Sequence, residues 1–366
     1  MVEKASEKGI NLPTSTKWRC ALAVVYAIMA AQVYDIYQHG NFLDYHSYGN
    51  FLDTTVWKGQ TSFLTIGALK RHVPELLSQL VLAIVFTFGH IVTRRLFYPI
   101  SDRLIKYKPA WTEEIRAARR DRWCASIFKL LYFISVSIWG WNLLIQQDWF
   151  PPALGGKGDL RNMLPSATRE GYGDSLWFYP TPVPTDANLY YRVASAYHLS
   201  ELIFQILIEW NRPDFYDMFL HHLCTCWLLV FSLVAGMERH GTVILFIHDV
   251  SDIPVYLCKF TVDVQGLHDA IVLTPYVGML VSWGYLRLWF LPQVIYRCYA
   301  DPLMLGLRGT DIFVLMLSCL VFLHCFWYFK FVQMGLRFLR GGGCEDGVAN
   351  LEKLEKYAYL FLSFLT

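Results

Sequence analysis

The sequence predicts an all-α polytopic membrane protein with about seven to eight transmembrane helices, and three observations support this fold class. Hydrophobic residues make up 55% of the 366 residues and charged residues 17%, whereas globular chains average roughly 25% charged residues. Apolar runs of about 20 residues, the length that a helix needs to cross the bilayer core, recur along the chain. The formal net charge is +2, which argues against a nucleic-acid-binding surface.

Eight segments are predicted to span the membrane as helices: 18–37, 77–98, 124–146, 189–209, 217–236, 242–260, 270–295 and 310–334. The first has a short apolar run, and we expect it to be retained as a span because no small-residue cleavage pattern closes it. The segments 77–98, 124–146 and 310–334 are the clearest spans. By contrast, 189–209 and 242–260 carry charged residues in their interiors, which suggests that they face protein and not lipid.

The charges of the connecting loops predict the orientation. The loop between the second and third spans contains an excess of Lys and Arg, which is typical of cytosolic loops. The segment 148–188 has more acidic than basic residues and many Pro and Gly, so we expect a lumenal loop. Eight spans then leave both termini in the cytosol. We expect an N-terminal region at 1–76 with one extra transmembrane or interfacial helix, a membrane domain at 77–338, and a short cytosolic tail at 339–366.

The span 217–236 carries a pair of histidines, His221 and His222, near its cytosolic end. Ionisable side chains at membrane depth are costly and usually face a protein interior for a functional reason. Adjacent residues on a helix point about 100° apart, so the two rings cannot both face one point. Thr225 shares the face of His221, which gives His221 a slight preference as the reactive member.

Two neighbouring spans carry polar stripes. In 242–260, five side chains occupy a stripe about 100° wide; these are His248, Asp249, Asp252, Tyr256 and Lys259. In 189–209, a second stripe about 120° wide includes His198 and Glu201. His324 stands in the last span, where a lone histidine is more often a packing residue than a catalyst. We expect these two stripes and the pair His221 and His222 to meet in one enclosed site.

An imidazole beside a carboxylate is suited to general base catalysis. The chain has no G-x-S-x-G nucleophile motif, no phosphate-binding Gly loop and no histidine spacing of the di-iron type. Cys224 and Cys226 would point about 200° apart on a helix, so no metal site is expected. Proton-transfer or acyl-transfer chemistry on a lipid-soluble substrate remains, with a proton-coupled transporter as the alternative that the residues leave open.

The stretch 218–259, MFLHHLCTCWLLVFSLVAGMERHGTVILFIHDVSDIPVYLCK, resembles the Lag1 motif of ceramide synthases, which lies within the TLC (TRAM–Lag1–CLN8) domain. That motif has a His-His pair, a Thr three residues later, Arg-x-Gly, Leu-His-Asp-x-x-Asp and a later Lys. The matching residues here are His221, His222, Thr225, Arg239, Gly241, His248, Asp249, Asp252 and Lys259. Leu323-His324-x-x-Trp327 is similar to the last-helix signature of the family. The chain departs from the motif at Pro254 and Tyr256.

The resemblance implies a TLC domain over 77–338, with six or so helices forming a barrel around a central cavity. It implies transfer of a fatty acyl group from acyl-CoA to the amine of a sphingoid base, giving (dihydro)ceramide and CoA in the endoplasmic reticulum membrane. Catalytic roles would fall to His221, His222, His248, Asp249 and Asp252. Substrate-binding roles would fall to Thr225, Arg239, Lys259, His198, Glu201 and His324.

The expected partners are acyl-CoA as co-substrate, a sphingoid base and the lipid bilayer, with no nucleic acid, no metal and no further cofactor. A homo- or heterodimer is an open alternative. Two other functions compete with acyl transfer: a non-catalytic TLC-domain protein of lipid sensing or translocation, and a proton-coupled lipid transporter. Release of CoA in the presence of a sphingoid base distinguishes the three.

Overall fold

The computed structural model describes residues 72–107, 111–163, 183–210, 212, 214–234, 237–300 and 310–340, in addition to the isolated residues 27 and 30. The expected span at 18–37 therefore lies outside the described residues, apart from these two positions. All further structural statements concern the described ranges.

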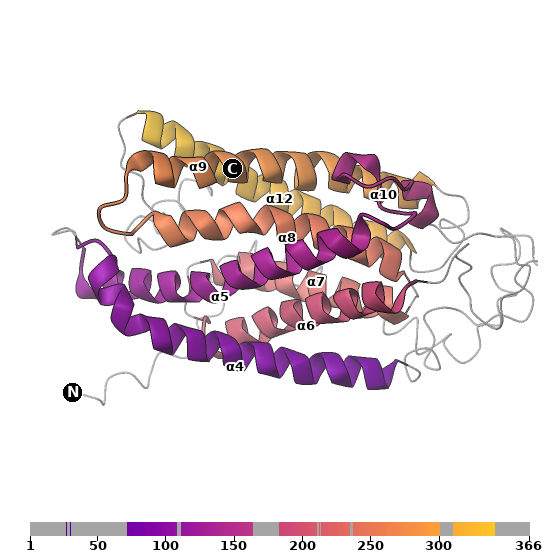
Figure 1. Ribbon diagram of the computed structural model, residues 1–366, viewed down its shortest axis with the longest axis horizontal. Coiled ribbons are helices and arrows are strands. Elements are labelled where there is room, and N and C mark those ends of the chain that lie inside the picture. The colour runs from indigo at the N-terminus through magenta and orange to yellow at the C-terminus, as the bar shows by residue number, and fades with distance from the viewer. Residues whose placement is uncertain are drawn as a thin grey trace, which may run out of the picture.

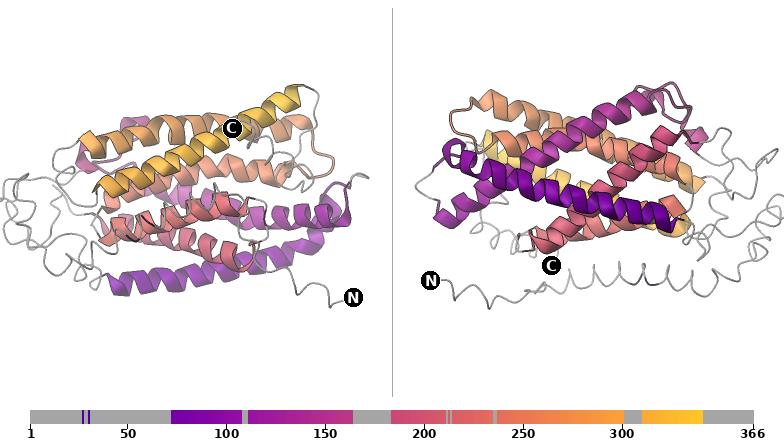
Figure 2. Two further views of the ribbon diagram at one scale, coloured as in Figure 1. Left: turned by 180° about the vertical axis from the view of Figure 1, so that it is seen from behind. Right: turned by 60° about the horizontal axis from the view of Figure 1, so that its bottom comes forward.

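Seven long helical segments run side by side along the long axis of the molecule (Figures 1 and 2). They are α4 (Val73–Leu104), α5 (Glu113–Leu144), α6 (Thr185–Leu207), α7 (Phe215–Val234), α8 (Glu238–Thr261), α9 (Asp269–Trp283) continued by η4 (Gly284–Phe290) and α10 (Leu291–Ala300), and α12 (Thr310–Leu339). Six of them are long and apolar enough to cross a membrane. The exception is α6, which carries one of the two polar stripes. The prediction of an all-α polytopic membrane protein is confirmed.

Six of these segments form a closed ring through their contacts. In order around the ring, α5 contacts α6, α6 contacts α7, α7 contacts α12, α12 contacts α9, α9 contacts α8, and α8 contacts α5. The remaining helix, α4, packs outside the ring against α5 and α6 (Figure 1). Contacts of α8 with α6 and α7 cross the ring, so the interior is packed by the polar and apolar faces of these helices.

Local signals explain where several helices begin. Thr112 caps α5, because its hydroxyl accepts from the backbone N–H of Ile115 at 3.3 Å, and two glutamates follow in the first turn. Both features satisfy or complement the unpaired N–H groups of a helix start. His268 caps α9 in the same way, with its Nδ1 accepting from the N–H of Ala270 at 3.2 Å.

At one end of the bundle, the segment that follows α4 contacts the segment that follows α8. We call this end the basic end, because the loop with excess Lys and Arg lies there. Ile105, after α4, forms an antiparallel bridge with Val264, after α8. Beside it, Arg119 of α5 makes an ion pair of 2.5 Å with Asp263. These contacts fix the ends of α4, α5 and α8 relative to one another.

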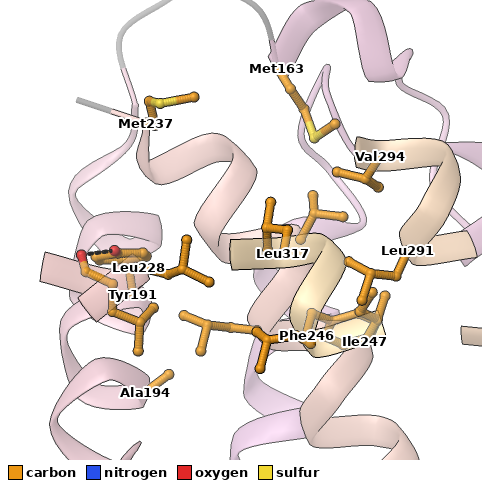
Figure 3. Close-up of a cluster of buried hydrophobic side chains, with 14 of the residues drawn as sticks. Met163, Tyr191, Ala194, Leu228, Met237, Phe246, Ile247, Leu291, Val294 and Leu317 are labelled. Carbon is orange, nitrogen blue, oxygen red and sulfur yellow. Dashed lines mark hydrogen bonds between the residues drawn. The ribbon is translucent and has the colours of Figure 1, made fainter. Parts of the chain in front are cut away.

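The opposite end of the ring is covered by the segment 145–163, which we call the cap. Trp149, Phe150 and Met163 of the cap are at most 1% exposed and belong to the main apolar core with residues of α6, α8, α10 and α12 (Figure 3). Arg239 at the start of α8 holds the cap, since it donates to the carbonyl of Asn162 at 2.7 Å and lies 4.3 Å over the Trp149 ring. The apolar core thus fills the half of the bundle next to the cap.

Candidate functional site

Four histidines from three helices gather in the interior, and we call them the imidazole cluster: His221, His222, His248 and His324. The ring centroids of His221 and His324 lie 6.1 Å apart, and those of His324 and His248 lie 5.0 Å apart. His222 is 5.3 Å from His221. None of the four is more than 9% exposed. The structure therefore brings α7, α8 and α12 together through their histidines.

The cluster contains buried polar atoms that make no hydrogen bond to the described residues. Buried ring nitrogens of His221, His222 and His324 have no hydrogen-bond partner among the described residues, and neither does the hydroxyl of Thr225. Buried polar groups normally have partners, so this set is suited to bind a polar substrate group. His198 of α6 is also buried, and its Nε2 likewise has no partner in this part of the chain.

Two carboxylates of α8, those of Asp249 and Asp252, contact different neighbouring helices. Asp252 Oδ1 lies 2.6 Å from a guanidinium nitrogen of Arg287, which comes from η4. Asp249 is fully buried and accepts from the hydroxyl of Tyr190 on α6 at 3.1 Å. The stripe on α8 thus contacts two different neighbours, one on each side.

Tyr190 has room to reach Asp249 because α5 has a glycine opposite its ring. A Cβ at Gly140 would lie 2.8 Å from the Tyr190 ring, which is inside van der Waals contact. We expect Gly140→Ala to displace Tyr190 and to destabilise the fold by about 1–3 kcal/mol, the usual effect of overpacking. Thermal unfolding in detergent measures this loss of stability.

Gly278→Ala on α9 is the matched control, because a Cβ there would meet only Pro254 at an ordinary 3.6 Å. An equal melting temperature for the two alanine variants would contradict the close approach of Tyr190 to α5.

A pocket opens between α5, α6, α7 and α8 toward the basic end, and we call it the basic pocket. Its charged lining consists of four basic and two acidic residues: Arg122, Lys129, Arg212, Lys259, Glu201 and Glu209. His222 and Tyr256 also line it. His222 is therefore the member of the His pair that faces the pocket, whereas His221 packs against the Trp327 ring at 5.3 Å.

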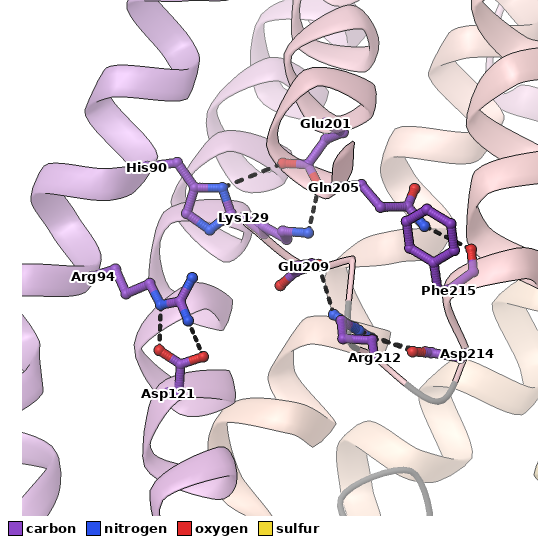
Figure 4. Close-up of polar contacts among 10 residues, drawn as sticks. All are labelled: His90, Arg94, Asp121, Lys129, Glu201, Gln205, Glu209, Arg212, Asp214 and Phe215. Atoms are coloured by element: carbon purple, nitrogen blue, oxygen red, sulfur yellow. Dashed lines mark hydrogen bonds and ion pairs between the residues drawn. The ribbon is translucent and has the colours of Figure 1, made fainter. Parts of the chain in front are cut away.

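A buried ion pair forms the inner wall of the pocket (Figure 4). Lys129 of α5 is paired with Glu201 of α6, and their side chains are 8% and 5% exposed. His90 of α4 lies beside them with its Nδ1 3.6 Å from Glu201 Oε1, stacked between Phe128 and Phe204 at centroid distances of 5.0 and 3.8 Å. This network links α4, α5 and α6 in the interior of the bundle.

Arg212 organises the mouth of the pocket between α6 and α7 (Figure 4). Its guanidinium pairs with Glu209 at 2.9 Å and with Asp214 at 2.8 Å. Burial alone would raise the pKa of Glu209, but the charge of Arg212 prevails and lowers that pKa to about 2. The pKa of Asp214 is lowered for the same reason. All three groups therefore carry charge at neutral pH.

Two of the expected site residues lie away from the imidazole cluster. Arg239 is nine residues before His248, about 13 Å along a helix, and is fully buried under the cap. Lys259 is at the other end of α8, where it lines the basic pocket and lies 4.5 Å over the Tyr256 ring. The structure thus associates Lys259 with the pocket mouth and Arg239 with the opposite end.

Besides Arg122, Glu209 and Arg212 of the pocket lining, three ionisable residues of this site were not predicted from the sequence: His90, Lys129 and Arg287. Each stands inside an apolar span, at 77–98, 124–146 and 270–295. The rule that intramembrane ionisable residues mark function would have found them, had it been applied to every span. Within the described ranges, no group of three or more His, Cys, Asp or Glu is placed to hold a metal ion.

Comparison with known proteins shows similarity over most of the chain. Residues 122–333 match the family described as the TLC domain. The chain is 26% identical over 289 residues to ASC1-like protein 3 of Oryza sativa subsp. japonica, covering 74% of this chain and 93% of that protein. It is 24% identical over 275 residues to Ceramide synthase LOH1 of Arabidopsis thaliana, covering 73% and 79%. It is 27% identical over 244 residues to Ceramide synthase 5 of Homo sapiens, covering 63% of this chain and about half, 55%, of that protein.

Proposed function

The chain belongs to the TLC-domain family, and we propose that within this family it acts as a sphingoid-base N-acyltransferase. The proposed reaction transfers a fatty acyl group from acyl-CoA to the amine of a long-chain base, and yields (dihydro)ceramide and CoA. One observation carries the proposal: the buried imidazoles of His221, His248 and His324 gather next to His222, which lines a pocket with a basic lining. The relatives named ceramide synthase support it.

The basic pocket suits the water-soluble part of acyl-CoA. Its lining has four cationic and two anionic side chains, which leaves an excess of positive charge. The phosphates of CoA are anionic, so this excess favours approach of the thioester from the basic end. His222 lies on the pocket wall, where the thioester carbonyl would arrive. We propose that this end faces the cytosol of the endoplasmic reticulum membrane, with both termini on the same side.

The chemistry requires a base. A sphingoid amine is an ammonium at neutral pH and attacks only after it loses a proton, which a neutral imidazole of His221 or His222 accepts. The amine nitrogen then bonds to the acyl carbon while the carbon–sulfur bond breaks, and the imidazolium returns its proton to the CoA thiolate. The nitrogen loses its second proton to water as the amide forms, so that one proton is released per turnover. Asp252 and Asp249 orient the cluster and offset the positive charge that develops on it.

A second route uses the same residues in two steps. The imidazole attacks the thioester and forms an acyl-imidazole as the carbon–sulfur bond breaks and CoA leaves. The deprotonated amine then attacks the acyl carbon, and the bond to the imidazole breaks to regenerate the free ring. Incubation with acyl-CoA alone, followed by intact-protein mass measurement, distinguishes the routes. A mass increase of one acyl chain supports the two-step route, whereas its absence under turnover conditions supports direct attack.

We expect the purified protein to release CoA from acyl-CoA continuously only when a sphingoid base is present, with one N-acyl product formed per CoA at steady state. A thiol-reactive dye measures the CoA, and mass spectrometry measures the product. Transport that depends on a proton gradient, without CoA release, would instead identify a transporter. Binding of lipid with neither transport nor CoA release would identify a non-catalytic TLC-domain protein.

A further inference from the structure

Arg287 is a deeply buried basic residue next to the imidazole cluster. It lies on η4, a π-helical stretch between α9 and α10, and its side chain is 2% exposed. A buried guanidinium at membrane depth is costly, and π-helical turns within α-helices occur frequently at functional sites. Both facts call for a role beyond packing.

The guanidinium of Arg287 binds one turn of α8 at three points. Its Nε donates to Ser251 Oγ at 2.6 Å, and one terminal nitrogen donates to the carbonyl of His248 at 3.0 Å. The same nitrogen is paired with Asp252 Oδ1 at 2.6 Å. Beneath the guanidinium, the Trp283 ring lies at 3.9 Å. A planar group with fixed donors and a stacked face has little freedom to move.

These three contacts fix the part of α8 that presents its chemistry to the site. His248 and Asp252 stand one helical turn apart and enclose Ser251 between them. Holding the carbonyl of His248 and the carboxylate of Asp252 with one rigid group sets the position of both side chains relative to His324. The contact engages one oxygen of Asp252, so the other can accept from a substrate ammonium or an imidazole.

We propose that Arg287 is a positioning residue for acyl transfer, which acts by fixing Asp252 and the turn that carries His248. The inference rests on the proposed function. Arg287 exchanges no proton itself, because a guanidinium stays protonated in proteins. Its effect is on the geometry of the groups that move the proton.

We expect Arg287→Gln to lower kcat for CoA release by roughly 10- to 100-fold, the size of effect that a small misplacement of catalytic groups produces. KM for acyl-CoA should stay within about threefold, since Arg287 is not part of the basic pocket. Arg287→Lys keeps the charge but cannot reach all three partners, so its kcat should fall between those of the wild type and Arg287→Gln. Arg297→Gln, at an exposed position of α10, is the control with unchanged kcat.

Thermal unfolding tests the pairing without relying on activity. Arg287→Gln leaves the Asp252 carboxylate without its partner and should lower the melting temperature by several degrees. Asp252→Asn in the same chain should restore much of that loss, because the uncompensated charge is gone. If the decrease in melting temperature of the double variant Arg287→Gln/Asp252→Asn equalled the sum of the two single decreases, the pairing would be overturned. If Arg287→Gln does not fold, Arg287→Lys and Ser251→Ala carry the test, with a lower kcat and an unchanged KM expected in each.

The outcomes separate this inference from the proposed function. A wild-type protein that releases no CoA with a sphingoid base contradicts the proposed function. An active wild type whose kcat is unchanged in the Arg287 variants, or whose KM alone changes, overturns the positioning role and leaves the function intact.

Discussion

Alanine at His221 or His222 should lower the rate of CoA release by about 10²- to 10⁴-fold, the range that removal of a general base produces. His222 lies on the wall of the basic pocket. The His221 ring lies 6.1 Å from that of His324, which in turn lies 5.0 Å from that of His248. Loss of either ring removes the proton acceptor or its link to the rest of the cluster. Steady-state CoA release with purified variants measures the effect.

The loss has to be separated from misfolding. Both variants should elute as the wild type does in size-exclusion chromatography, and their melting temperatures should lie within a few degrees of it. His72→Ala is the control. His72 directly precedes α4, which lies outside the ring, and its partly exposed side chain pairs with Glu75 in the first turn of that helix. Full activity in either His221→Ala or His222→Ala would remove the basis of the acyl-transfer proposal.

Methionine at Lys129 should destabilise the folded protein by about 3–5 kcal/mol, because it leaves the buried Glu201 carboxylate unpaired. Both partners are less than 10% exposed, and the pair joins α5 to α6 in the interior of the bundle. Chemical unfolding in detergent measures the change. The double variant Lys129→Met/Glu201→Gln should recover most of the lost stability, since a neutral pair leaves no charge uncompensated.

Lys330→Met provides the comparison at the surface. Lys330 pairs with Asp217 at 3.3 Å, but the lysine side chain is 50% exposed, and exposed ion pairs contribute at most about 1 kcal/mol. If Lys129→Met were as mild as Lys330→Met, or if the double variant recovered nothing, the buried pair would not stabilise the bundle.

Most of the fold could be predicted from the sequence, because the bilayer sets the length of a helix that crosses it. The apolar runs from 77–98 to 310–334 each fall on one of the helical segments α4 to α12. The boundaries were less accurate: α4 and α5 extend beyond the runs into the basic loop. Those extra turns carry charged side chains that form ion pairs, such as Arg119 with Asp263. A hydropathy profile does not detect such pairs, so it makes these helices too short.

The candidate site was predicted in part. Helical spacing grouped His248, Asp249 and Asp252 on one stripe of α8, and the structure buries the first two and places all three inward. Spacing within one helix does not reveal which neighbour each residue meets. A stripe about 100° wide can contact two helices, which is why Asp249 bonds Tyr190 on α6 while Asp252 bonds Arg287 on η4. Arg239 shows the same limit along the helix axis, since it holds the cap instead of the cluster.

Arg239 and the core side chains of residues 145–163 cover one end of the ring, and the basic pocket lies toward the other end. Under the proposed function, CoA and the water that could hydrolyse its thioester would both reach His222 from that end. In the two-step route, bound CoA would shield the new acyl-imidazole from water, and hydrolysis would compete with acyl transfer only after CoA leaves.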